Sequence, residues 1–160
     1  GVGSRGAIGQ GHRDENLAIA RTNFVGALAQ IDAAIALMRR RGAGHLVLIS
    51  SVAAIRPLPG TSAIYSASKA GLASLGESLA VEYSGTPIKI STIFPGYIRT
   101  PMNEHKGKLP FEVDEAAGVE AIMAAIDREV PKSFAPTWPW WLVSHYLRHM
   151  PSKILKRRFA

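Results

Sequence analysis

The sequence predicts an α/β fold in which a parallel sheet is covered by helices on both faces. Two short, apolar, β-prone runs, residues 45–50 and 88–94, alternate with long segments whose apolar residues recur every three or four positions. A third helix and a last short strand follow between residues 114 and 136. Because helices and strands alternate strictly, the strands are expected to run parallel and to bind ligands at their carboxyl ends.

Each predicted helix has an apolar stripe and a start or stop signal. The first covers residues 17–41 and ends in three arginines followed by Gly42, which is a typical stop signal. The second covers residues 64–83, where Ala, Leu and Ser dominate. The third follows Asp114, whose carboxylate can cap it, and extends to about residue 129.

The predicted strands differ in their expected places in the sheet. Residues 45–50 lack polar alternation, which is typical of a strand buried on both faces, so we expect a central strand. Residues 88–94 form the next strand, and Pro95-Gly96 ends it. Residues 133–136 are expected to form an edge strand, because Pro136 cannot donate a backbone hydrogen bond.

The composition describes one globular domain and excludes several kinds of chemistry. The chain has 160 residues, of which 47% are hydrophobic, and no Cys. Disulfides, zinc–thiolate sites, iron–sulfur clusters and cysteine nucleophiles are therefore excluded, and a reducing, cytoplasmic compartment is expected. The longest charge-free run, residues 133–147, has 15 residues. A membrane-spanning helix needs about 20, so none is expected.

The net charge of +7 is unevenly distributed. Residues 1–44 carry six Arg and three acids, residues 45–136 carry eight basic and nine acidic side chains, and residues 137–160 carry five basic side chains and no acid. A nucleic-acid-binding protein would spread its cations over one face, so nucleic acid is not an expected partner.

Chemistry is indicated where the first strand leads into the second helix. Ser50 and Ser51 end the strand, and Tyr65 and Lys69 are four residues apart in the helix, which places them on one face. An ammonium beside a phenol favours the phenolate, so we expect a lowered pKa for Tyr65 and a role as general acid or base. A serine hydroxyl at the strand end can polarise a substrate oxygen. Adjacent strand residues point to opposite faces, so only one of Ser50 and Ser51 can serve.

These motifs occur in a fixed order that resembles a known family. The segment GHLVLISSVAAIRPLPGTSAIYSASKAGLASLGESLAVEY, followed by IKISTIFPGYIRTPM, resembles the short-chain dehydrogenase/reductase family of NAD(P)-dependent oxidoreductases. The resemblance covers roughly residues 1–130 and implies a Rossmann-like, doubly wound parallel sheet. It also implies hydride transfer between NAD or NADP and a secondary alcohol or ketone, and a homo-oligomer, either a dimer or a tetramer.

The resemblance assigns a role to each motif residue. Tyr65 becomes the acid/base, Lys69 lowers its pKa and binds the nicotinamide ribose, and Ser51 holds the substrate oxygen. Asn23 matches the asparagine that kinks the first helix and holds a water in the proton relay. The loop that grips the nicotinamide carboxamide is expected to contain the following residues: Pro95, Gly96, Ile98 and Thr100.

The beginning of the chain lacks the expected phosphate-binding signature. Residues 1–6 fit the pattern G-x-G-x-x-G, but no strand precedes them and the long helix does not follow at once. The chain also begins without Met, so we expect it to lack the first cofactor-binding half of the family's domain. Two functions stay open at this point. One is an NAD(P)-dependent oxidoreductase, and the other is a non-catalytic fragment that acts as a dimerisation or binding module.

Residues 137–160 form an aromatic, basic tail after the catalytic portion, residues 1–136. The tail can lie in a membrane interface, or it can pack over the substrate cleft or a partner subunit, and peripheral membrane contact stays open.

The five histidines share no spacing that suggests a metal site. Residues 101–113 are expected to form a mobile substrate loop, whose apolar side chains suggest a lipophilic ligand.

Overall fold

The computed structural model describes residues 1–3, 6–56, 62–102 and 107–159, with side chains up to Lys156. Three predicted features therefore lie partly outside the described residues. They are the glycine-rich beginning at residues 4–5, the turn at residues 57–61, and the substrate loop at residues 103–106.

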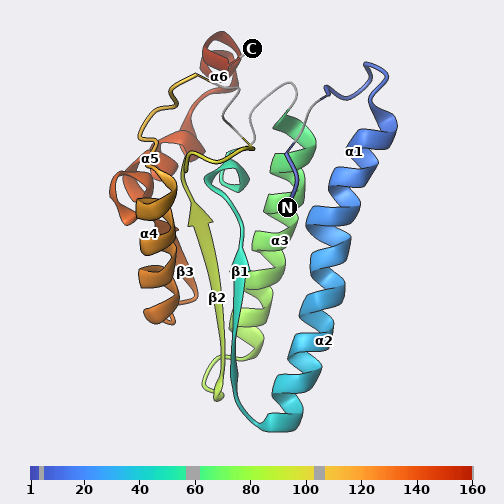
Figure 1. Ribbon diagram of the computed structural model, residues 1–160, viewed down its shortest axis with the longest axis vertical. Helices are drawn as coiled ribbons and strands as arrows, with labels where there is room; N and C mark the ends of the chain where they lie inside the picture. Colours follow the sequence, from blue (N-terminus) through green and yellow to red (C-terminus); the bar gives the residue numbers. More distant parts are fainter. Residues whose placement is uncertain (4–5, 57–61, 103–106, 160) are drawn as a thin grey trace.

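Helices and strands alternate along the chain as the sequence predicts (Figure 1). The first part contains α1 (Arg13–Ala20), the π-helix η1 (Arg21–Val25), α2 (Gly26–Arg41), β1 (Gly44–Ile49), the 3₁₀-helix η2 (Val52–Ala54) and α3 (Ala63–Glu82). The second part contains β2 (Ile88–Pro95), α4 (Glu115–Asp127), β3 (Lys132–Ala135), α5 (Thr137–His149) and α6 (Ser152–Phe159). The predicted alternation of helices and strands therefore gave the α/β class correctly.

The first predicted helix is one rod made of three segments. Figure 1 shows α1 and α2 as a continuous rod beside α3. It begins four residues before the predicted start, and η1 interrupts its α-helical hydrogen bonding. It ends where predicted, because Gly42 adopts a left-handed conformation with φ of 75° after three arginines in the last turn.

The sheet has the order β1-β2-β3, and both pairs are parallel. The predicted central position of β1 is wrong for the described sheet, because β1 pairs on one side only and Ile49 keeps 39% of its surface exposed. The central strand is β2, which has neighbours on both sides and five consecutive buried residues. The short strand β3 lies at the other edge, as Pro136 predicts.

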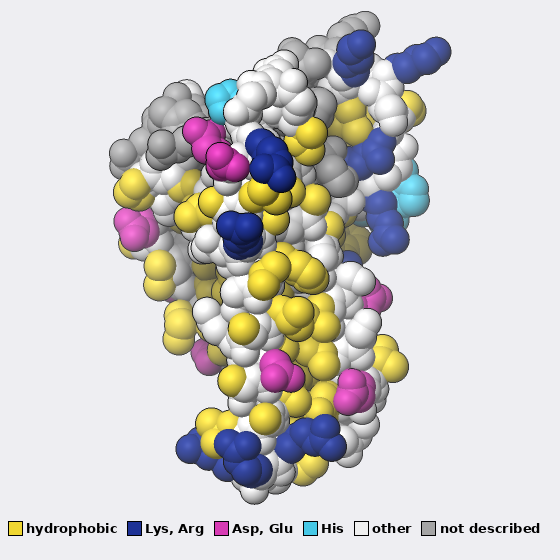
Figure 2. Space-filling model, turned by 90° about the vertical axis from the view of Figure 1, so that its right-hand side faces the viewer, with side chains coloured by type: hydrophobic (Ala, Val, Ile, Leu, Met, Phe, Trp, Pro, Cys, Tyr) yellow, Lys and Arg dark blue, Asp and Glu magenta, His cyan; other side chains and the backbone are white. Residues whose placement is uncertain are grey.

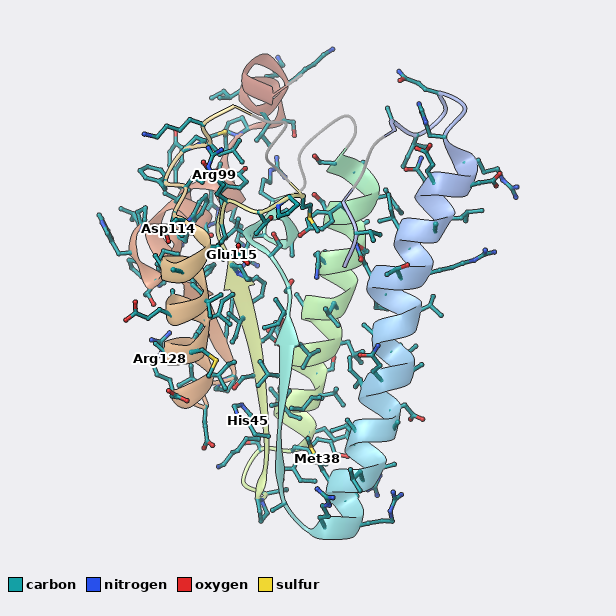
Figure 3. The ribbon with its side chains drawn as sticks, viewed as in Figure 1. Met38, His45, Arg99, Asp114, Glu115 and Arg128 are labelled. Carbon is teal, nitrogen blue, oxygen red and sulfur yellow. The ribbon has the colours of Figure 1, made fainter. Side chains whose placement is uncertain are left out.

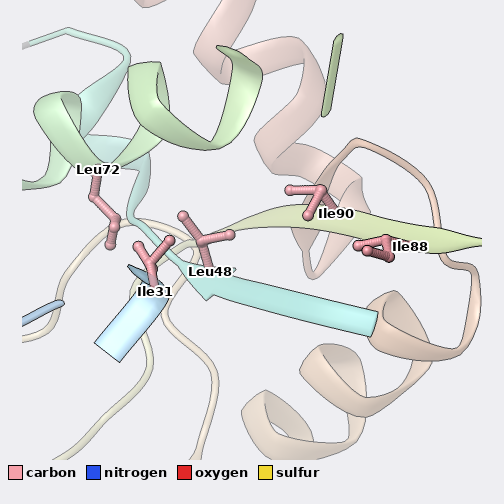
Figure 4. Packing of buried hydrophobic residues seen from close by; sticks show 5 residues of the cluster. All are labelled: Ile31, Leu48, Leu72, Ile88 and Ile90. Atoms are coloured by element: carbon pink, nitrogen blue, oxygen red, sulfur yellow. The ribbon is translucent and has the colours of Figure 1, made fainter. Parts of the chain in front are cut away.

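Helices cover both faces of the sheet. On one face, α2 and α3 contribute to a core cluster with β1 and β2 (Figure 4), which consists of Ile31, Leu48, Leu72, Ile88 and Ile90. On the other face, Ala125 of α4 packs with Ile93 and Ala135 of the two neighbouring strands. Gly76 allows close contact between α3 and β2, because a Cβ there would overlap the side chain of Thr92.

The C-terminal segment packs onto the end of the sheet. Trp140 of α5 is 2% exposed and packs with Val52 and Phe94. Arg56 joins the junction of α5 and α6 to the segment after η2, since its Nη2 donates to the carbonyl oxygen of Met150 at 3.0 Å. Among the helices of the described residues, none is both long enough and apolar enough to cross a membrane.

Candidate active site

The two serines at the end of β1 have different environments. Ser50 is buried, and its hydroxyl donates to the backbone oxygen of Lys69 in α3 at 2.9 Å. Ser51 is the N-cap of η2, where its oxygen accepts a hydrogen bond from the N–H of Ala53 at 3.2 Å, and it also hydrogen-bonds Tyr65. Because Ser50 is engaged with the helix backbone, Ser51 is the serine that faces the phenol.

Tyr65 and Lys69 lie in the first two turns of α3, next to the carboxyl end of β1. The Lys69 ammonium is 6.0 Å from the centre of the Tyr65 ring. Its Nζ donates to the carbonyl oxygen of Ile49 at 2.8 Å. Together with the bond from Ser50, this gives two hydrogen bonds in opposite directions between β1 and α3. They fix the position of Lys69 relative to the sheet.

Burial dominates the electrostatics of this pair. It raises the pKa of Tyr65 above its ordinary value, and the hydrogen bond with Ser51 opposes that rise without reversing it. Burial also lowers the pKa of Lys69. The expected lowering of the Tyr65 pKa is therefore wrong for this chain. Removing the phenolate from water destabilises it by more than the neighbouring groups stabilise it.

Asn23 is buried within η1 and binds the beginning of the chain. Its Oδ1 accepts from the N–H of Val2 at 2.8 Å, and its Nδ2 donates to the carbonyl oxygen of Val2 at 2.9 Å. Gly1 lies between Asn23 and Lys69. A Cβ on Gly1 would be 2.7 Å from Asn23 Oδ1 and 3.5 Å from Lys69 Nζ. The chain beginning thus lies directly against the predicted site.

Ser68 connects Asn23 to α3, and sequence reasoning missed it. Its hydroxyl donates to the carbonyl oxygen of Tyr65 at 2.7 Å and accepts from Asn23 Nδ2 at 3.4 Å. The signal was available, because a serine three residues after Tyr65 can bond back along its own helix. The structure therefore links Asn23 to the backbone of Tyr65 through Ser68, and the Lys69 ammonium lies 6.0 Å from the Tyr65 ring centre.

The loop after β2 is attached to β3, α4 and α5. The N–H of Gly96 donates to the carbonyl oxygen of Ala135 at 3.0 Å, directly after Pro95 ends β2. A Cβ on Gly96 would overlap the indole of Trp140. Ile98 forms a parallel bridge with Val113, and Thr100 follows as a partly buried residue. Because β1 and β2 are parallel, this loop leaves the sheet at the carboxyl ends of the strands, the end where Ser51 lies.

Trp140 is a second residue that the sequence analysis did not assign. Its indole meets Tyr97 edge-on at 5.1 Å between ring centres and Phe111 at 6.1 Å. Burial raises the pKa of Tyr97. Trp140 thus contacts both the loop after β2 and the core residues Val52 and Phe94 at the end of the sheet. Its position within an aromatic, proline-containing run gave no periodicity from which this contact could be predicted.

No cluster of three or more His, Cys, Asp or Glu side chains that could hold a metal ion occurs within the described ranges. His45 has a different role, since its Nε2 hydrogen-bonds the Ser91 hydroxyl at 2.9 Å between β1 and β2 (Figure 3).

Comparison with known proteins identifies the family of the chain. The family model described as short chain dehydrogenase matches residues 1–109. An uncharacterised oxidoreductase of Mycobacterium tuberculosis is 44% identical over 160 residues, which cover all of this chain and 63% of that protein. The chain therefore belongs to the short-chain dehydrogenase family.

Solved structures show the same fold. A short-chain dehydrogenase from Burkholderia cenocepacia in complex with NADP superposes with a TM-score of 0.81 at 19% identity, over all of this chain and 66% of that one. Levodione reductase superposes with a TM-score of 0.60 at 31% identity, over 66% of this chain and 41% of that one. The Rossmann-type α/β fold is thus confirmed. The chain spans about 63% of the length of the mycobacterial relative.

Proposed function

We propose that the protein to which this chain belongs is an NAD(P)-dependent oxidoreductase that interconverts a secondary alcohol and a ketone. The observation that carries the proposal is the Ser51–Tyr65–Lys69 arrangement at the carboxyl ends of the parallel strands. In open α/β sheets, ligands bind at the carboxyl ends of the strands.

The residues present fit the nicotinamide ribose end of such a cofactor. Lys69 is 9% exposed, and its ammonium has three donors, of which one binds Ile49. A buried ammonium with donors to spare is suited to the ribose hydroxyls, and the Tyr65 hydroxyl lies on the same helix face. Pro95, Gly96, Ile98 and Thr100 would line the carboxamide side. The choice between NAD and NADP is left open.

The chemistry divides between the cofactor and the chain. A bound nicotinamide supplies or accepts the hydride. Tyr65 Oη donates a proton to the carbonyl oxygen during reduction and takes it from the alcohol during oxidation. The Ser51 hydroxyl hydrogen-bonds the same substrate oxygen and holds it beside the phenol. The Lys69 ammonium stabilises the phenolate that remains after proton donation, and Asn23 holds the helices that carry these groups.

Relatives support this choice of reaction. The matching family is described by dehydrogenase activity, and the mycobacterial relative is described as an oxidoreductase. Levodione reductase, at 31% identity, is named as a reductase of a dione, which fits a carbonyl substrate. The non-catalytic alternative differs in one measurable respect, because a binding module needs no phenol at residue 65.

The test compares Tyr65→Phe with the unchanged protein at its natural length, using ketone reduction by NADH or NADPH. We expect turnover to fall by about 10²- to 10⁴-fold, the usual contribution of a general acid, while circular dichroism stays unchanged. Tyr83→Phe is the matched control, because Tyr83 ends the same helix far from Ser51. Turnover that survives Tyr65→Phe would refute the mechanism.

We propose further that the protein self-associates through α2. Figure 2 shows hydrophobic side chains gathered along this side of the molecule. On α2 and the segment before it, Val25 is 56% exposed and Leu28 44% exposed. Analytical ultracentrifugation of Val25→Glu tests this idea, and an unchanged oligomeric state would contradict it.

A further inference from the structure

We propose that the outer face of α5 is a docking surface for an anionic lipid bilayer. This inference goes beyond the oxidoreductase proposal and does not depend on it. The surface combines an exposed aromatic stripe on α5 with a cation-lined cavity, and Trp141 belongs to both.

The aromatic stripe consists of Trp138, Trp141, Leu142 and Tyr146. Their exposed fractions are 71%, 60%, 47% and 65%. Trp141, Leu142 and Tyr146 recur at helical spacing, so they lie on one side of α5. The opposite side holds Trp140, which is 2% exposed and packs against the sheet. The helix is therefore anchored by its inner face, and its outer face presents large aromatic groups to solvent, the groups that accumulate at membrane interfaces.

A cavity of about 440 Å³ lies next to this stripe, between α5, β3 and the end of α4. Arg128, Lys132, His145 and Arg148 line it, and no acidic side chain is among its lining residues in the described part of the chain. Figure 3 shows Arg128 at the end of α4. The acids nearest in sequence, Asp127 and Glu129, are exposed and do not line the cavity.

Ser144 supplies a second indication of a ligand. It lines the cavity, is 2% exposed, and its hydroxyl has no hydrogen-bond partner. It lies at helical spacing from Trp141 and Arg148, which line the same cavity. A buried hydroxyl is normally paired, so an anionic oxygen in the cavity would satisfy it. Lys132 also lines the cavity and adds a cation there, and its Nζ lies 5.1 Å from the Phe94 ring centre.

The charge of this region favours an anionic bilayer over a second copy of the chain. Residues 137–160 carry five basic and no acidic side chains. Self-association through a shared face would bring these cations together, and that is unfavourable. An anionic lipid surface instead attracts the cations, accepts the aromatic stripe at its interface and supplies a phosphate oxygen for the cavity.

Co-sedimentation of the 160-residue chain with vesicles tests this proposal. We expect binding to phosphatidylcholine vesicles that contain phosphatidylglycerol, and little binding to phosphatidylcholine alone. Trp141→Ala with Tyr146→Ala should weaken binding at least about tenfold, because it removes interfacial apolar area. The matched control is Val81→Ala with Val119→Ala, two exposed apolar residues on α3 and α4, and it should bind like the unchanged chain.

A second pair of variants tests the cavity. Arg128→Gln with Arg148→Gln should weaken binding about tenfold or more, since each cation near an anionic surface contributes appreciably. Arg40→Gln with Arg41→Gln removes the same charge from the distant end of α2 and should have a much smaller effect. Equal losses in these two pairs would show that net charge alone binds the lipid, which would overturn the site.

Other outcomes would also overturn the proposal. One is that the unchanged chain binds neither kind of vesicle. Another is that the variant Trp141→Ala with Tyr146→Ala binds as well as the unchanged chain. Loss of a dimer in the aromatic variant, measured by ultracentrifugation, would show instead that the face pairs two copies. Circular dichroism of each variant confirms that the helices remain folded, and none of these measurements uses enzymatic turnover.

Discussion

Asn23→Ala is expected to destabilise the chain by about 2 kcal/mol through loss of the bonds to Val2. The side chain makes two hydrogen bonds to the Val2 backbone, at 2.8 and 2.9 Å, and each contributes about 1 kcal/mol. Val2 is 42% exposed, so water can reach its freed groups and the larger penalty for a fully buried orphan does not apply. Alanine is also a better helix former than asparagine, by about 0.5 kcal/mol, and this gain must be separated from the loss.

Asn16→Ala provides that separation. Asn16 lies earlier on the same rod, and its Oδ1 has no hydrogen-bond partner, so its replacement brings the helix gain without a comparable loss. Urea unfolding followed by circular dichroism measures both free energies of unfolding. We expect Asn23→Ala to be less stable than Asn16→Ala by about 2 kcal/mol. Equal stabilities would refute the reasoning, as would unchanged hydrogen exchange at the Val2 amide.

Three further variants test other parts of the structure. The difference in phenolate absorbance between the unchanged chain and Tyr65→Phe reports Tyr65, and it should titrate above pH 10.0, because burial raises the pKa of this phenol. The contribution of the phenol to stability is complete below pH 10.0 and is lost as the pH rises through the pKa of the folded state. A titration midpoint below 10.0 would contradict this. Gly96→Ala should destabilise the chain by about 1–3 kcal/mol, because its Cβ overlaps Trp140, whereas Gly107→Ala, with open space around it, should not; thermal unfolding distinguishes them. Ser50→Ala should lower the free energy of unfolding in urea by about 1 kcal/mol while sparing turnover, and a loss of turnover instead would assign this serine to the chemistry.

Local sequence rules predicted the elements well because each depends on neighbouring residues. Asp114 caps α4 as expected, since its Oδ1 accepts from the N–H of Ala117 at 2.8 Å. Gly42 ends α2 for the equally local reason that its backbone adopts a positive φ. The interruption of the first rod by η1 could not be derived from apolar spacing, because a π-helix differs from an α-helix in its hydrogen bonds and not in its composition.

Features that depend on distant contacts were harder to predict. The apolar run of β1 indicated a central strand, but position in a sheet depends on which strands pair with it. The spacing of Tyr65 and Lys69 correctly placed both on one helix face, yet it gave no measure of their burial. The direction of the Tyr65 pKa shift depends on that burial, so spacing alone led to the wrong sign.

The two pKa shifts together have a consequence for the proposed reaction. Burial raises the pKa of Tyr65 and lowers that of Lys69, so both shifts oppose a phenolate beside an ammonium. The chain by itself therefore keeps the phenol protonated, which is the form that donates a proton to a carbonyl oxygen. Formation of the charged pair requires further stabilisation of the phenolate. Ser51 provides part of it, because its hydrogen bond lowers the pKa of Tyr65 and thus favours the phenolate. The same serine would hold the substrate oxygen, so substrate position and proton transfer depend on one hydroxyl group.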